Sequence, residues 1–190
     1  MGKALFIVDV QNDFTEGGAL GVAGGDAVAE GISQYLADHA GEYDIVIASR
    51  DWHDGTGDNG GHFATSGAPD FVETWPVHCV AGTPGADYDP GLSTASITHH
   101  VKKGQGKPAY SLFEGVTDDG RTVPDVLDAH GITDVDVTGI ATDYCVRASA
   151  LDAIAHGRHV RVLTSLVAGV ASASSETALA ELAHAGAELV

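Results

Sequence analysis

Residues 4–10 read Ala-Leu-Phe-Ile-Val-Asp-Val, and this stretch decides the fold. The run is apolar without alternation and contains β-branched residues, which is typical of a strand buried on both faces of a parallel sheet. Its one polar residue, Asp9, stands near the carboxyl end. Further along, Val28, Ile32 and Leu36 follow one another at a spacing of four, which places them on one face of a helix. The chain is therefore predicted to begin with a buried strand and an amphipathic helix.

The same alternation of strand and helix continues to the end of the chain. Further strands are predicted at residues 44–48, 97–102, 135–140, 160–163 and 187–190. Helices are predicted at about residues 124–130 and 143–156, and from residue 174 or 175 to a stop at Gly186. Strands that alternate with helices indicate an α/β protein, in which helices cover both faces of a parallel sheet.

Residues 51–96 interrupt this alternation. They are rich in Gly, Pro, Thr and Asp, and they contain three of the ten histidines. A connection of this length without secondary structure of its own is usually functional in a compact domain. Since no linker, repeat or low-complexity segment divides the chain, we predict a single domain over residues 1–190 with a functional loop region at about 51–96.

The composition excludes several classes of partner. Nine Lys and Arg residues stand against 27 Asp and Glu, for a formal net charge of −18. We therefore expect no nucleic acid and no anionic membrane as partner, because both require neutralised phosphates. Cys79 and Cys145 are too few for a disulfide framework, and no apolar run is long enough to span a bilayer. A cytoplasmic protein is expected, as a monomer or a homo-oligomer.

Reactive side chains follow four of the predicted strands. These are Asp9, Asp51, the pair Lys102 and Lys103, and Cys145 at the start of a helix. Because ligands bind beyond the carboxyl ends of the strands in such sheets, we expect these side chains to share one site. A helix N-terminus favours the thiolate of Cys145, and Asp9 could serve as its general base. The alternatives are a packing role for the thiol, a carboxylate bonded to loop amides, and either lysine as the cation.

A second group of side chains lies in the loop region and comprises Asp51, His53, His62 and His78. Imidazole and carboxylate ligands together are typical of divalent metal sites. Asp51 and His53 are two residues apart, so on an extended segment they point the same way. We favour a metal centre here over separate histidines bonded to backbone. Asp54 and Asp58 stand beside glycines and are interpreted as turn residues.

Five segments of the chain resemble one known family. They are Val-Asp-Val-Gln-Asn-Asp-Phe at 8–14, Asp-Trp-His at 51–53, Trp-Pro-Val-His-Cys-Val-Ala-Gly-Thr-Pro-Gly-Ala at 75–86, Tyr-Ser-Leu-Phe-Glu-Gly at 110–115 and Gly-Ile-Ala-Thr-Asp-Tyr-Cys-Val at 139–146. Together they resemble the nicotinamidases/pyrazinamidases within the isochorismatase-like hydrolases, from residue 3 to the C-terminus. The segments around Asp9 and Cys145 are typical of the superfamily, whereas the Asp/His set and Trp-Pro-x-His-Cys-Val are specific to this branch.

The resemblance implies a fold and a catalytic set. The fold is the three-layer α/β/α isochorismatase-like hydrolase fold, with a six-stranded, mostly parallel sheet. The implied catalytic triad is Asp9, Lys103 and Cys145, with Lys103 chosen because it stands seven residues before Tyr110. Backbone amides of Ala141 and Cys145 would form the oxyanion hole, and a cis peptide would join residues 140 and 141.

The resemblance also implies a cofactor and a substrate. One divalent metal ion (Zn, Fe or Mn) would be held by Asp51, His53, His62 and His78. In the family, the pyridine nitrogen of nicotinamide binds this metal. The substrate is a small aromatic carboxamide, and the residues expected to contact it are Phe14, Trp75, Tyr110 and Ile140.

The implied reaction is hydrolysis of nicotinamide, and also of pyrazinamide, through a cysteine thioester, in NAD salvage. Rival interpretations are a superfamily hydrolase of isochorismate or of N-carbamoyl compounds, a metal-hydroxide hydrolase, and a metal-binding protein with an inactive site. The first two need no thiol or no metal, respectively, so the joint presence of both sets argues against them. Two features depart from the family pattern: a longer Gly-rich loop at 54–61, and Tyr144 where some members have His.

Overall fold

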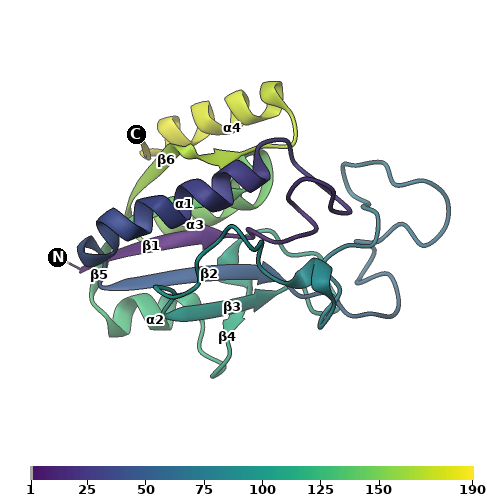
Figure 1. The fold of residues 1–190 in the computed structure, drawn as a ribbon, viewed down its shortest axis with the longest axis horizontal. Coiled ribbons are helices and arrows are strands. Elements are labelled where there is room, and N and C mark those ends of the chain that lie inside the picture. Colours follow the sequence, from purple (N-terminus) through teal and green to yellow (C-terminus); the bar gives the residue numbers. More distant parts are fainter. Residues whose placement is uncertain (1) are drawn as a thin grey trace.

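The structure, a computed structural model, describes residues 2–190 and arranges them as a central sheet with helices on both faces (Figure 1). The strands are β1 (Gly2–Val8), β2 (Ile45–Asp51), β3 (His99–Lys103), β4 (Val116–Thr117), β5 (Ile132–Ile140), β6 (His159–Ala168) and β7 (Glu188–Leu189). The α-helices are α1 (Gly25–His39), α2 (Val123–Ala129), α3 (Arg147–Ala155) and α4 (Ser172–Ala185).

The sheet has the strand order β4-β3-β2-β1-β5-β6-β7. All neighbouring pairs are parallel except β3 and β4. The predicted α/β class is confirmed, and the six predicted strands are the six parallel ones. The predicted total of six is wrong, because the sheet has seven strands. The additional one, β4, has two residues and pairs antiparallel with β3, and so short an edge strand leaves no periodic pattern in the sequence.

Several element boundaries also differ from the prediction. β6 continues to Ala168, past the exposed Thr164 and Ser165 that interrupt its apolar run. α3 begins at Arg147 rather than at about residue 143, because residues 142–146 form a π-helical turn. The nucleophile candidate Cys145 therefore lies in this turn and not in the first turn of a regular α-helix.

The core explains why β1 has no alternation. On one face of the sheet, Leu5 and Ile7 pack with residues of α1 such as Ile32. On the other face, Phe6 and Val8 pack in a second cluster that includes residues of α2, α3 and α4. Both faces of β1 are thus buried, as the continuous apolar run predicted.

The topology places the carboxyl ends of the central strands at one end of the molecule. β1 lies between β2 and β5. Strands β2 to β4 extend the sheet on one side of β1, and strands β5 to β7 extend it on the other side. The arrows of β1, β2 and β3 point to the end where the long irregular segment after β2 gathers (Figure 1). A crevice at such a topological switch point is where open α/β sheets bind ligands.

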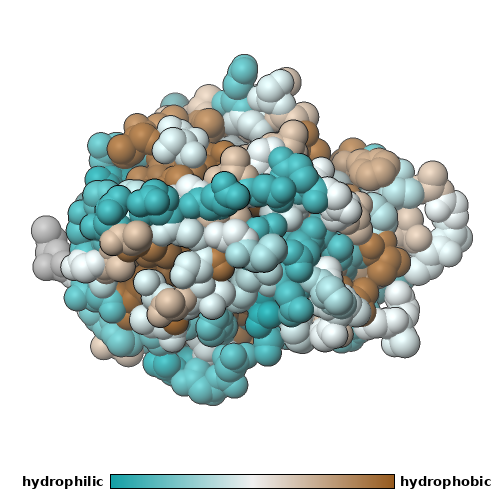
Figure 2. Space-filling view, in the orientation of Figure 1, coloured by the Kyte–Doolittle hydropathy of each residue, from teal (hydrophilic) through white to brown (hydrophobic). Residues whose placement is uncertain are grey.

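The surface view shows a hydrophilic band over α1 and hydrophobic side chains among the loops at the opposite end from the N-terminus (Figure 2). In the loop segment, Phe71, Val72 and Val77 are exposed to 54%, 70% and 57%. Within residues 2–190, none of the helices combines the length and the apolar character that crossing a bilayer requires.

Candidate active site

Lys103, at the end of β3, is the centre of a buried cluster of charged and reactive groups. Its side chain is fully buried. The Nζ atom lies 2.9 Å from Asp9 Oδ2, 3.6 Å from Cys145 Sγ and 3.2 Å from the carbonyl oxygen of Ala109. It also donates a hydrogen bond to Asp51 Oδ1. One ammonium group therefore contacts side chains that follow or end β1, β2 and β5.

The neighbouring Lys102 points elsewhere. Its Nζ lies 2.9 Å from Asp118 Oδ1 and over the Trp52 ring, and its side chain is 29% exposed. The structure thus brings Lys103, and not Lys102, to the other reactive side chains. Adjacent residues on a strand point to opposite faces, so only one of the pair can reach the site.

Asp9 directly follows β1 and is fully buried. Its backbone adopts a positive φ of 49° where the chain leaves the sheet. The Ser49 hydroxyl donates a 2.7 Å hydrogen bond to Oδ1, which leaves Oδ2 for the ammonium of Lys103. Burial raises the pKa of Asp9 above its usual value, although Lys103 acts in the opposite direction. The carboxylate is therefore a better proton acceptor than an exposed Asp.

Cys145 lies in the π-helical turn after β5, and 7% of it is exposed. The carbonyl of Ala141 accepts hydrogen bonds from the amides of Tyr144 and Val146, which fixes the backbone of the turn. The expected cis peptide between Ile140 and Ala141 is present. Burial raises the pKa of the Cys145 thiol well above its usual value, against the effect of Lys103, and the negative charges of Asp9 and Asp51 raise it further.

This direction is opposite to the one that the helix-dipole argument predicted, which favours the thiolate. Burial removes most of the hydration of this thiol, and that effect on its pKa outweighs one ammonium group at 3.6 Å. The raised pKa favours the thiol form of Cys145, which shares its Lys103 contact with the Asp9 carboxylate. The pair therefore needs proton transfer before Cys145 can act as a nucleophile.

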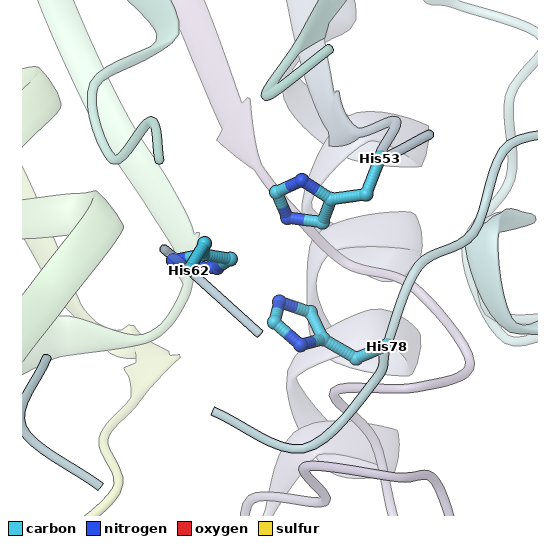
Figure 3. Close-up of side chains that lie close together, drawn as sticks. All are labelled: His53, His62 and His78. Carbon is cyan, nitrogen blue, oxygen red and sulfur yellow. The ribbon is translucent and has the colours of Figure 1, made fainter. Parts of the chain in front are cut away.

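Three histidines of the loop region come together beside this cluster. The rings of His53, His62 and His78 point toward a common centre from separate chain segments (Figure 3). Each offers a ligand atom, and these atoms lie within 4.8 Å of one another. The longer loop at 54–61 does not displace His62, because Asn59 closes the loop through hydrogen bonds in both directions with the backbone of Asp54.

The hydrogen bonds and the burial of these rings suit metal ligation. The Nδ1 atoms of His53 and His78 donate 2.7 Å hydrogen bonds to the carbonyls of Gly104 and Pro76, which leaves Nε2 as the ring nitrogen of each that can reach a metal. Both ring nitrogens of His62 are buried without a hydrogen-bond partner among residues 2–190. Burial lowers the pKa of His62 to about 3, so its ring is neutral. Unpartnered neutral imidazoles are the form that binds a divalent metal.

Asp51, the fourth expected ligand, connects the two groups. Its Oδ2 atom lies 3.6 Å from His53 Nε2 and 3.8 Å from His78 Nε2, while Oδ1 accepts from Lys103. Burial acts to raise the pKa of Asp51, but Lys103 and the two histidines hold it well below its usual value. The carboxylate is therefore ionised, as a metal ligand must be.

A cavity of about 280 Å³ opens onto both groups. Cys145, Asp51, His62 and His78 line it, whereas Asp9, Lys103 and His53 lie behind the lining. All four residues expected to contact substrate also line it: Phe14, Trp75, Tyr110 and Ile140. The Trp75 indole donates to the Tyr110 hydroxyl at 3.2 Å, so the aromatic wall is held together by its own polar contact.

The sequence argument missed part of this wall. The larger apolar residues among the further lining are Leu20, Val22, Phe71, Tyr144 and Val170. The ring of Tyr144 packs edge-on against Trp75, with 5.1 Å between centroids, and its place next to Cys145 in the sequence was a usable signal. Phe71 and Val170 lie in irregular segments, where no periodic pattern indicates which way a side chain points.

The isochorismatase domain matches this chain over residues 3–190, and the chain belongs to the isochorismatase family. The expected resemblance to the nicotinamidase/pyrazinamidase branch is also confirmed. The chain is 50% identical over 188 residues to the nicotinamidase/pyrazinamidase of Mycobacterium tuberculosis, covering 99% of this chain and 98% of that protein.

Solved structures agree with this assignment. The pyrazinamidase of Pyrococcus horikoshii in complex with zinc has a TM-score of 0.85 and 37% identity, covering 100% of this chain and 99% of that one. PnC1 from L. infantum in complex with nicotinate also has a TM-score of 0.85, with 36% identity, covering 100% and 92%.

Proposed function

We propose that this protein, acting as a single domain, hydrolyses nicotinamide, and also pyrazinamide, to the carboxylic acid and ammonia. The observation that carries the proposal is the Lys103 cluster. It places a thiol, a proton-accepting carboxylate and a fixed positive charge together at the wall of an aromatic-lined cavity. The names of the relatives support the substrate class, since they include nicotinamidases and a structure with bound nicotinate.

The first half of the proposed reaction forms a thioester. Asp9 takes the proton of the Cys145 thiol while Sγ attacks the carboxamide carbon. Lys103 stays protonated, because Asp51 and Asp9 raise its pKa well above its usual value despite burial. Its charge stabilises the sulfur as the proton leaves. Asp9 then gives that proton to the departing nitrogen, and the C–N bond breaks to release ammonia.

The second half restores the enzyme. Asp9 takes a proton from a water molecule, whose oxygen attacks the thioester carbon, and the C–S bond breaks. The proton returns to Cys145 as the carboxylic acid product forms. The raised pKa of Asp9 suits a group that accepts and donates a proton in each half of the cycle.

Backbone amides are proposed to stabilise the negative oxygen in both halves. We assign this role to the N–H groups of Ala141, directly before the π-helical turn, and of Cys145 within it. One oxyanion-hole donor typically lowers the barrier by about 3 kcal/mol.

A divalent metal ion, Zn, Fe or Mn, fits the histidine group. His53, His62 and His78 would hold it with Asp51, since the histidine ligand atoms lie within 4.8 Å of one another, the His62 ring is neutral and the Asp51 carboxylate is ionised. When bound, the metal supplies a Lewis acid for the pyridine nitrogen, which orients the ring. Phe14, Trp75, Tyr110 and Ile140 would enclose the ring and exclude water.

Ammonia release from nicotinamide by the purified, zinc-loaded protein tests the proposal. We expect Cys145→Ala to lose at least ~10³-fold in kcat while zinc content stays that of the parent protein. Cys79→Ala is the matched control, because this second buried thiol does not line the cavity, and we expect it to keep its activity. No ammonia from the parent protein would contradict the assignment of nicotinamide as substrate.

A metal-hydroxide hydrolase is the rival mechanism. It predicts that Cys145→Ala stays active as long as zinc is bound, whereas the thioester mechanism does not. His53→Ala is the complementary test, because it removes a proposed metal ligand and leaves the Cys145 nucleophile in place. In the proposed mechanism it loses zinc and raises KM more than it lowers kcat, because the metal orients the ring and the nucleophile is intact.

A further inference from the structure

The side chain of Gln11 forms hydrogen bonds with the backbone of Asp51. Its Nε2 donates hydrogen bonds to the carbonyls of Asp51, at 3.0 Å, and Ala86, at 2.9 Å. Its Oε1 accepts from the Asp51 amide at 2.8 Å. The side chain is fully buried, and these three contacts satisfy its carboxamide in the interior.

These hydrogen bonds are explained by the way in which β1 ends. β1 and β2 are paired in parallel register as far as Ile7 and Ala48, and Asp9 then donates to Ser49 before the chain turns away. Because β1 has turned away, the backbone amide and carbonyl of Asp51 that face it have no strand residue to bond with at this point. The carboxamide of Gln11 offers a carbonyl oxygen and an N–H group, as a peptide group does, and these take the place of the missing backbone partner of Asp51.

Asp13 makes a similar contact with the histidine loop. Its Oδ2 accepts a 2.6 Å hydrogen bond from the amide of Cys79, the residue after His78. The carbonyl of Cys79 in turn accepts from the amide of His53 at 3.0 Å. The Cys79 peptide therefore lies between two of the three histidines. The contact also needs Gly85, because a Cβ there would lie 2.2 Å from Asp13 Oδ2.

We propose that Gln11 and Asp13 are positioning residues for the metal centre, acting through the backbones of Asp51 and Cys79. Neither touches the group of ligand atoms itself. Both come from the segment that directly follows Asp9, so this one segment supplies the catalytic carboxylate and supports three expected metal ligands. The inference rests on the metal site of the proposed function.

Zinc affinity, measured by competition with a chromophoric chelator, tests this inference independently of catalysis. We expect Gln11→Met, which keeps the volume but removes all three hydrogen bonds, to weaken zinc binding by about 10- to 100-fold. Asp13→Ala should weaken it about 10-fold, and Asp13→Asn should recover most of that loss, because an amide oxygen still accepts from Cys79.

Thr138→Val is the matched control. Thr138 is fully buried on β5, and its hydroxyl donates a 2.8 Å hydrogen bond to the Phe6 carbonyl, away from the histidine group. Removing it leaves a buried carbonyl with one bond fewer, so the melting temperature should fall while zinc affinity stays within 2-fold of the parent.

The outcomes separate the inference from the function it rests on. A parent protein without zinc affinity would overturn the metal site and this inference together. Folded variants of Gln11 and Asp13 that bind zinc like the parent would overturn only the inference. The same would follow if Thr138→Val lost as much affinity, or if Asp13→Asn were as weak as Asp13→Ala. Should Gln11→Met fail to fold, the two Asp13 variants decide the matter.

Discussion

The sheet contains two buried charge clusters with opposite balances of charge. Near the amino ends of the strands, Asp136 of β5 accepts hydrogen bonds from Tyr43 and Arg161 and lies 3.0 Å from Lys3 Nζ. One carboxylate thus has two cations. Burial would raise the pKa of Asp136, but Arg161, Tyr43 and Lys3 lower it below its usual value.

In the second cluster, at the carboxyl ends of the strands, one cation contacts two carboxylates and a thiol. Lys103 contacts Asp9, Asp51 and Cys145, and burial leaves the pKa of Asp9 raised. The comparison shows how one sheet uses the same chemistry in two ways. An excess of positive charge fixes a carboxylate as an anion and stabilises the fold, whereas a shortage leaves a carboxylate able to exchange a proton.

Removing the cation of the second cluster should have the largest effect. We expect Lys103→Met to lower the free energy of unfolding by about 3–5 kcal/mol, because it leaves two carboxylates buried without the ammonium group that balances their charge, and to abolish turnover. Urea unfolding at neutral pH measures the loss. Lys102→Met is the control, and its partly exposed pair with Asp118 should be worth less than about 1 kcal/mol. Equal losses from both variants would contradict the special role of Lys103.

Removing the carboxylate of the first cluster should have a smaller effect, confined to stability. Asp136→Asn keeps the side-chain volume and one acceptor, while Arg161 is 36% exposed and can turn to water. We expect the free energy of unfolding to fall by about 1–3 kcal/mol, with kcat within 2-fold of the parent. Parallel urea titrations and ammonia-release assays check both statements. A fall in kcat without a fall in stability would show that the two clusters are coupled.

The sequence predicted the parts of the molecule that depend on regular repetition. The apolar run of β1 and the alternation of strands with helices were enough for the fold class and the six parallel strands. Because those strands are parallel, Asp9, Asp51, Lys103 and Cys145 were expected at one edge, and the structure brings them together. Their catalytic and metal-binding roles stay predictions.

Other features depended on tertiary contacts that leave no local pattern. The two-residue β4 and the cavity residues Phe71 and Val170 belong to this group. Gln11 belongs to a motif that the sequence analysis identified, but its hydrogen bonds with the Asp51 backbone depend on where β1 turns away. The raised pKa of Cys145 was not predicted, because a helix N-terminus can be recognised in the sequence, whereas burial of the thiol cannot.

The smallest expected effect concerns how stability depends on pH. The contributions of Asp136 and Asp9 to the free energy of unfolding should change with pH in opposite directions. The pKa of Asp136 is lower in the folded than in the unfolded chain, where it is about 3.9. Its contribution to stability is therefore complete above that value and is lost as pH falls through the folded pKa. The pKa of Asp9 is raised instead, so its ionisation begins to destabilise the fold as pH rises above about 3.9, and the full effect is reached above its folded pKa.

Urea unfolding between pH 3 and pH 7, with a chelator present so that no metal charge acts on Asp51, measures these slopes. The stability of the parent relative to Asp136→Asn should rise with pH at the acid end of this range. Relative to Asp9→Asn it should fall as pH rises, in each case by no more than about 1.4 kcal/mol per pH unit, since one proton is involved. Slopes of the same sign would mean that Lys103 stabilises the Asp9 anion more than burial destabilises it. Asp9 would then be a fixed anion like Asp136, and the proton that leaves Cys145 would need another acceptor.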